Sequence, residues 1–232
     1  MKFLSYENKF GQFMSVVVDI VVLGMLWFLT SLPVITIGAS STALLYTANK
    51  TILKGEGYLF SSYFKAFARE FKQATVLWIF LLAYYAYMII DAITTFGVNI
   101  SLEDLGNGIM IFKLIVFLVI TLWTQYWFAY LSKFTDKIRT ILGNTLSMTF
   151  VHLLASFVLL ILFVLMLVAT GLAIYHFAPA VLFIPGAYAC AAMFFFEKVF
   201  ENYIPEDQGG KLVVPKETEK AEETLLEEST EK

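Results

Sequence analysis

Three charged residues interrupt the long apolar runs of this sequence, and they are the first candidates for chemistry. Asp19 lies in the first run, and Asp91 and Lys113 lie in two later ones. A charge inside a lipid bilayer is costly, and it marks a transport pathway, a proton relay or an ion pair. We expect Asp19 either to serve a pathway or to reach the inner membrane surface. For Asp91 and Lys113 the favoured interpretation is a structural ion pair, and the alternative is a solute or ion site.

Uncharged polar side chains within the apolar runs form a second group of candidates. Thr42, Gln125 and His152 carry a hydroxyl, a carboxamide and an imidazole. Such groups form hydrogen bonds between membrane helices. We interpret Gln125 and His152 as helix-to-helix contacts, with a proton relay as the alternative for His152. Thr42 belongs with Asp19, because a transporter would need both on one water-filled route.

Motifs of known enzyme classes are missing from the sequence. There is no HExxH, Walker loop, GxSxG, CxxC or glycine-rich dinucleotide turn. Cys190 is the only cysteine, which excludes an internal disulfide and a cysteine metal cluster. We therefore expect a protein that is not an enzyme, has no cofactor or metal, and binds no nucleic acid.

The amino-acid composition indicates a membrane protein whose surface contacts lipid. Of its 232 residues 59% are hydrophobic and only 15% are charged, with a mean hydropathy of +0.75. A water-soluble core cannot bury that much apolar surface. The N-terminal MKFLSYENKFGQF lacks the short apolar core and small-residue site of a cleavable signal, so we expect the first run to remain as an anchor. The prediction is an all-α, multi-pass bundle in the cell membrane.

The first apolar run predicts a helical hairpin. Thirty residues without charge separate Asp19 from Lys50, which is too many for one crossing of about 20 residues. Pro33 marks the break, since proline removes a backbone donor and restricts the residue before it. The arms are then 13–32 and 36–53. The second arm is rich in small and hydroxyl side chains, which favour close helix contact.

Four further crossings follow from the later runs. We place them at 74–96, 109–131, 152–175 and 180–200; the last two share a run of 46 residues, 151–196, without Asp, Glu, Lys or Arg. Short amphipathic helices are expected on the membrane surface at the N-terminus, at 58–73 and at 133–148. An aromatic belt at the membrane interface is expected from Trp123, Tyr126, Trp127 and Tyr130.

Basic residues predict the orientation of these six crossings. With both termini in the cytoplasm, fifteen of the sixteen Lys and Arg residues fall inside, as expected for short cytoplasmic loops. If 36–53 only dipped into the membrane, five crossings would remain and the N-terminus would lie outside. Residues 1–204 then form the transmembrane domain. Residues 205–232 hold nine acids and four lysines, a composition typical of a disordered cytoplasmic tail.

The first hairpin resembles the N-terminal signature of the YesL family of bacterial membrane proteins. The resemblance rests on Trp27 followed by SLPVITIGASSTALLY, and continues through Phe64-Lys65, Phe71-Lys72-Gln73, Arg139 with Asn144, and FIPGAYA. Members of that family are often encoded beside carbohydrate uptake and utilisation systems of Gram-positive bacteria. The resemblance implies a partner role next to a carbohydrate ABC transporter or another membrane protein, and no catalytic residues.

Two functional classes stay open. An accessory or scaffold subunit of a carbohydrate uptake system can have a dry, aromatic-packed bundle. A small-solute transporter needs a continuous polar cavity that Asp19 and Thr42 line near the middle of the membrane.

Overall fold

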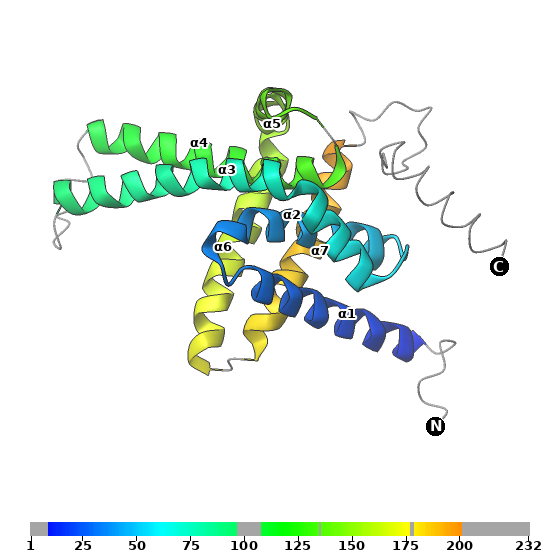
Figure 1. Cartoon of the computed structure of the whole chain (residues 1–232). Helices are drawn as coiled ribbons and strands as arrows, with labels where there is room; N and C mark the ends of the chain where they lie inside the picture. The colour runs from blue at the N-terminus through cyan, green and yellow to red at the C-terminus, as the bar shows by residue number, and fades with distance from the viewer. Residues whose placement is uncertain (1–8, 97–107, 135, 177–178, 201–232) are drawn as a thin grey trace.

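The computed structural model describes residues 9–96, 108–134, 136–176 and 179–200, which form an all-α bundle (Figure 1). The start of the predicted N-terminal surface segment and the acidic tail lie outside these residues. In chain order the helical elements are α1 (Lys9–Thr30), η1 (Val34–Thr36), α2 (Ile37–Thr47), η2 (Ala48–Leu53), α3 (Leu59–Phe96), α4 (Gly108–Lys133), α5 (Ile138–Val151), α6 (Leu153–His176) and α7 (Ala180–Phe200).

The predicted break of the first hairpin is present. α1 ends at Thr30, Pro33 is extended with φ −74° and ψ 110°, and the 3-10 turn η1 begins at Val34. Because proline cannot donate to the preceding turn, the helix stops here and the chain reverses. The Thr36 hydroxyl closes the corner by donating to the Thr30 carbonyl at 2.5 Å.

The second arm of that hairpin differs from the predicted crossing at 36–53. α2 has only 11 residues and runs into η2, a π-helical turn of six residues. Five helices of the described residues are long and apolar enough to cross a membrane, namely α1, α3, α4, α6 and α7, and α2 is not among them. Nine of the α2 residues are buried. The small and hydroxyl side chains that suggested close contact therefore place α2 at the centre of the bundle.

The third predicted crossing and the surface helix before it are one continuous element. α3 runs for 38 residues, or about 57 Å at 1.5 Å per residue, nearly twice the hydrocarbon thickness of about 30 Å. No proline or glycine occurs in α3 to end the helix near residue 73. Its first part exposes Lys65, Arg69 and Lys72, as expected for a surface segment.

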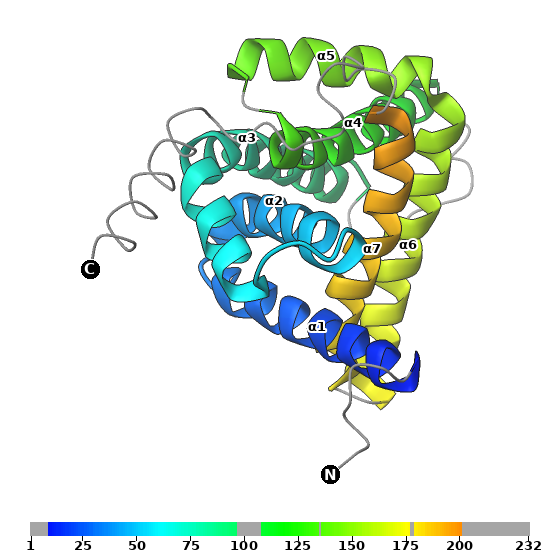
Figure 2. The same cartoon turned by 90° about the vertical axis from the view of Figure 1, so that its right-hand side faces the viewer.

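The other helices surround α2. α2 packs mainly on α3 and also contacts α1, α4 and α7, while α6 and α7 form an antiparallel pair that α1 crosses. Figure 2 shows α2 between α1 and the α3–α4 pair, with α6 and α7 along one side and α5 across the top. The outer ends of α3 and α4 extend together beyond the rest of the bundle (Figure 1).

Glycines allow two of these crossings to be very close. A Cβ atom at Gly24 of α1 would lie 1.8 Å from the Leu182 carbonyl oxygen of α7, and one at Gly186 would lie 2.3 Å from the Ile20 carbonyl oxygen. A Cβ atom at Gly38 of α2 would lie 2.5 Å from the Ala74 carbonyl oxygen of α3. Small residues let helix backbones approach in this way where lipid removes the hydrophobic drive for association.

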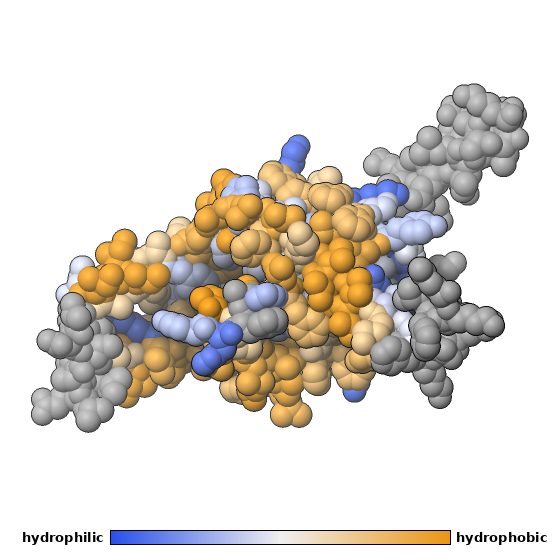
Figure 3. All heavy atoms as spheres, turned by 90° about the horizontal axis from the view of Figure 1, so that it is seen from below, coloured by the Kyte–Doolittle hydropathy of each residue, from blue (hydrophilic) through white to orange (hydrophobic). Residues whose placement is uncertain are grey.

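The outer surface is apolar, but the predicted aromatic belt is not on it. Figure 3 shows hydrophobic side chains over the face seen from below, as lipid contact requires. Tyr126, Trp127 and Tyr130 are instead buried in the core, at most 6% exposed. The Tyr126 hydroxyl lies 2.9 Å from the Ser156 hydroxyl, and Trp123 donates to the Thr145 hydroxyl at 3.0 Å. The expectation of an interfacial belt is therefore wrong; these rings join α4 to α5 and α6.

Candidate functional site

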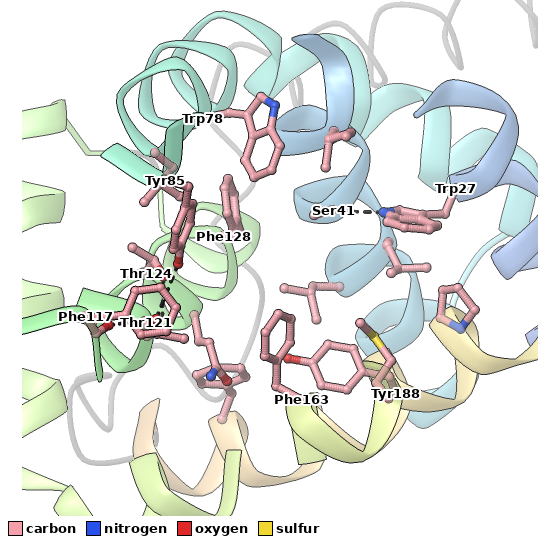
Figure 4. A pocket seen from close by; sticks show the side chains of 18 residues that line it. Trp27, Ser41, Trp78, Tyr85, Phe117, Thr121, Thr124, Phe128, Phe163 and Tyr188 are labelled. Carbon is pink, nitrogen blue, oxygen red and sulfur yellow. Dashed lines mark hydrogen bonds between the residues drawn. The ribbon is translucent and has the colours of Figure 1, made fainter. Parts of the chain in front are cut away.

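A cavity of about 320 Å³, here called the central cavity, lies where α1, α2, α3, α4, α6 and α7 meet (Figure 4). Its lining is mostly aromatic and aliphatic. The aromatic members are Trp27, Trp78, Tyr85, Phe117, Phe128, Phe163, Tyr188 and Phe196. Ligand sites of proteins commonly combine such a lining with a few polar groups and begin at about 300 Å³.

The polar side of the central cavity belongs to α4. Thr121, Thr124 and Gln125 line it and share one helix face, because residues three and four apart are neighbours. Both threonine hydroxyls donate back into the helix, Thr121 to the Phe117 carbonyl at 2.8 Å and Thr124 to the Thr121 carbonyl at 3.0 Å. The two hydroxyls are therefore satisfied without a ligand.

The Gln125 carboxamide is not satisfied. Its amide nitrogen and its oxygen are both buried, and neither finds a hydrogen-bond partner among the described residues. A buried amide without partners costs free energy, and such groups are uncommon in native proteins. The prediction that Gln125 hydrogen-bonds to another helix is therefore wrong; it is the one predicted polar candidate that lines the central cavity.

Hydrogen bonds and ring contacts hold the aromatic walls. Trp27 donates to the Ser41 hydroxyl at 3.2 Å, which fixes the α1 side. The rings of Phe163 and Tyr188 meet edge to face with centroids 6.2 Å apart and form the α6–α7 side. Figure 4 shows Trp78, Tyr85 and Phe128 on the side opposite this pair. The walls are therefore preformed.

A second cavity, of about 460 Å³, lies between α3 and α4 and contains Asp91 and Lys113. Tyr85 and Phe117 line both cavities, and their rings meet edge to face at 5.8 Å. The Lys113 Nζ lies 2.7 Å from the Asp91 Oδ2. The favoured interpretation of these two residues as an ion pair therefore matches the geometry.

The remaining predicted candidates lie away from both cavities. Asp19 is half-buried on α1 and makes no hydrogen bond or ion pair with the described part of the chain. The Thr42 side chain is fully buried and donates to the Gly38 carbonyl at 3.1 Å. His152 lies between α5 and α6, and its backbone carbonyl accepts from the Ser156 hydroxyl at 3.1 Å, a bond within the first turn of α6. The structure thus does not bring Asp19 and Thr42 onto one route.

One charged cluster, around Glu197 of α7, was not predicted from the sequence. The Glu197 Oε1 accepts from the Lys54 Nζ at 3.0 Å, the Lys133 Nζ at 3.2 Å and the Asn49 Nδ2 at 3.1 Å. These partners come from η2, from the residue after it, and from the last residue of α4. The signal that could have revealed this cluster is a lone acid near the end of α7, together with lysines at the ends of η2 and α4. It ties three chain segments together at one end of the bundle.

In the comparison with known proteins, the N-terminal part of this chain is similar to one family. Residues 20–92 match the family model described as "Protein of unknown function, DUF624", a family of bacterial membrane proteins. The matched region runs from α1 through α2 into α3, so it includes the Pro33 corner and the buried second arm. No curated protein and no solved structure matches the chain. From α1 into α3, this membrane-spanning helical protein is similar to the bacterial membrane proteins of DUF624.

Proposed function

We propose that this chain is a non-enzymatic accessory or scaffold subunit of a carbohydrate uptake system, with a carbohydrate ABC transporter as its partner and both termini in the cytoplasm. The observation that carries the proposal is that the bundle interior is mainly apolar. In the described residues, the central cavity is largely aromatic, and Asp19 and Thr42 line neither cavity. A transporter for a polar solute needs such groups along one hydrated path.

The hydroxyl groups of α2 also favour a structural role. Thr42 and Ser40 each donate to a carbonyl four residues earlier in the chain, at 3.1 and 2.9 Å. A side chain used in this way satisfies itself within the helix. The hydroxyl-rich second arm therefore supports close packing of α2 on α3 better than it supports a lining for solute.

The carbohydrate part of the proposal comes from the resemblance to the YesL family, whose members are often encoded beside carbohydrate uptake systems. That resemblance rests mainly on the Trp27 to Tyr46 region, which also lies within the DUF624 match. An integral membrane partner fits a chain whose long helices expose apolar side chains.

A small-solute transporter is the second candidate. The observation in its favour is that the two cavities adjoin at Tyr85 and Phe117. Together they lead from the Asp91–Lys113 pair to the middle of the bundle. The side chains between them are predominantly apolar, which disfavours a polar solute.

Uptake measurements separate the two functions. A strain lacking this chain is assayed with radiolabelled mono- and disaccharides and then complemented with wild type, Asp19→Asn or Thr42→Val. An accessory subunit predicts that both variants restore uptake fully, because neither residue lies on a route. Loss of uptake with normal membrane levels of either variant would favour the transporter.

Reconstitution and cross-linking complete the test. The full chain alone in proteoliposomes should give no sugar flux. A photoreactive amino acid at Ile90 or Ile115, both more than half exposed on the outer part of the α3–α4 pair, should cross-link to a permease subunit in cells. Leu165, equally exposed on α6, serves as the comparison site. Sugar flux through the chain alone would contradict the proposal.

A further inference from the structure

We propose that the central cavity binds a planar, lipid-soluble molecule that presents a hydrogen-bond donor beside an acceptor, and that Gln125 recognises this edge. This inference goes beyond the proposed accessory role and does not depend on it. It stands on the shape and lining of the cavity and on the unsatisfied carboxamide at its α4 side.

The Gln125 side chain defines the polar edge of the ligand. A carboxamide carries an N–H donor and a carbonyl acceptor side by side in one plane. Both are buried and unpaired within the described residues, so the side chain turns toward the cavity to meet a ligand. A lactam, an imide or a primary amide satisfies both with two parallel hydrogen bonds, whereas a hydrocarbon satisfies neither.

The neighbouring polar groups limit how much polarity the ligand can have. The hydroxyl protons of Thr121 and Thr124 are donated to backbone carbonyls. The Tyr85 hydroxyl lies 3.4 Å from the Thr121 hydroxyl. Thr121 and Thr124 thus offer only spare acceptor lone pairs, and the Ser41 and Tyr188 hydroxyls are the other hydroxyl groups of the lining. A sugar would leave most of its hydroxyls unpaired against aromatic walls, and that is costly.

The aromatic walls and the volume indicate a flat ring. Rings from α1, α3, α4, α6 and α7 surround the cavity, and aromatic side chains favour stacked or edge-on contact with another ring. A volume of 320 Å³ is about twice that of the engineered 150 Å³ cavity that binds benzene. It therefore accommodates a fused two-ring molecule. Phe117, which is 41% exposed and lines the cavity, places one edge of the site next to lipid.

A pair of matched probes tests the proposal. 2-Quinolinone has two fused rings with an N–H next to a carbonyl, and naphthalene has the same ring shape without them. Dissociation constants are measured by titration calorimetry on the full chain in nanodiscs, and protein-free nanodiscs correct for partition into lipid. We expect saturable binding of 2-quinolinone about tenfold tighter than naphthalene, as one to two net hydrogen bonds provide.

Substitutions assign the preference to Gln125. Gln125→Leu keeps the approximate size, removes two unpaired polar atoms, and should abolish the tenfold preference without lowering the melting temperature. Gln125→Met is the second variant, in case leucine does not fit. Gln73→Leu is the matched control, because Gln73 also has a buried, unpaired amide oxygen but lines neither cavity. Equal binding of both probes by wild type, no saturable binding of 2-quinolinone, or a preference that survives Gln125→Leu would overturn the proposal.

Discussion

The Lys113 Nζ of α4 lies 2.7 Å from the Asp91 Oδ2 of α3, and both side chains are about one quarter to one third exposed (31% and 23%). The two residues come from the outer halves of helices that extend together beyond the rest of the bundle (Figure 1). Each charge alone would be costly beside lipid, whereas the pair neutralises both. This contact therefore joins the α3–α4 pair where other helices give it little support.

Removing either partner of this pair should destabilise the protein. We expect Asp91→Asn and Lys113→Met each to lower the free energy of unfolding by about 1 to 3 kcal/mol, because each leaves a stranded charge. The double variant should cost less than the sum. Unfolding in mild detergent measures all three. Strictly additive losses would show that the two residues do not interact.

The close crossing of α1 and α7 predicts a strong effect at Gly24. Gly24→Ala places a methyl group 1.8 Å from the Leu182 carbonyl oxygen, so the helices must separate, at a cost of about 1 to 3 kcal/mol or more. Gly171→Ala on α6 is the control, since nothing lies within 4 Å of its added Cβ. Alanine there should be neutral, or stabilising by up to about 1 kcal/mol through helix propensity. Equal melting temperatures for the two variants would contradict this packing.

Removing the negative charge of Glu197, near the C-terminal end of α7, should destabilise the protein. Glu197→Gln keeps the shape of the side chain but removes the carboxylate that Lys54 and Lys133 share. The Lys133 side chain is only 6% exposed, so we expect a loss of about 2 to 4 kcal/mol. Adding Lys133→Met should recover part of it, which thermal unfolding of the single and double variants measures. A double variant that is less stable than Glu197→Gln would be inconsistent with the cluster.

Labelling of single cysteines tests the orientation. Residues 34–53 form 20 residues of consecutive helical turns from η1 through η2, which is about the number that one crossing of the hydrocarbon layer needs. We therefore predict that this stretch completes a return across the membrane and that both termini are cytoplasmic. In a Cys190→Ser background, an impermeant maleimide should reach a cysteine at Gly108 from outside intact cells and should not reach one at Ser61. The reverse pattern would refute the orientation, and an external N-terminal tag would indicate that α2 does not cross.

Several features of this protein follow from its sequence alone. Pro33 ends α1 because it lacks an N–H, whatever surrounds it. The uncharged runs give helices because lipid leaves backbone groups no other partner, and the ends of α4, α6 and α7 fall within about two residues of those expected. The Asp91–Lys113 pair could be predicted as well, since two residues equally far from one turn lie at equal depth on adjacent helices.

Other features depended on the tertiary structure, because a hydrophobic pattern gives the apolar face of a helix but not the neighbour of that face. Trp127 and Tyr130 suit a membrane interface equally well by composition, and only the packing of α2 and α5 against α4, with the Phe200 ring of α7 against Tyr130, buries them. The contacts of Glu197 with Lys54 and Lys133 exist only because the fold brings the end of α7 next to the ends of η2 and α4. The unpaired amide of Gln125 could not be predicted from the sequence, because it depends on which hydrogen-bond partners the surrounding helices supply.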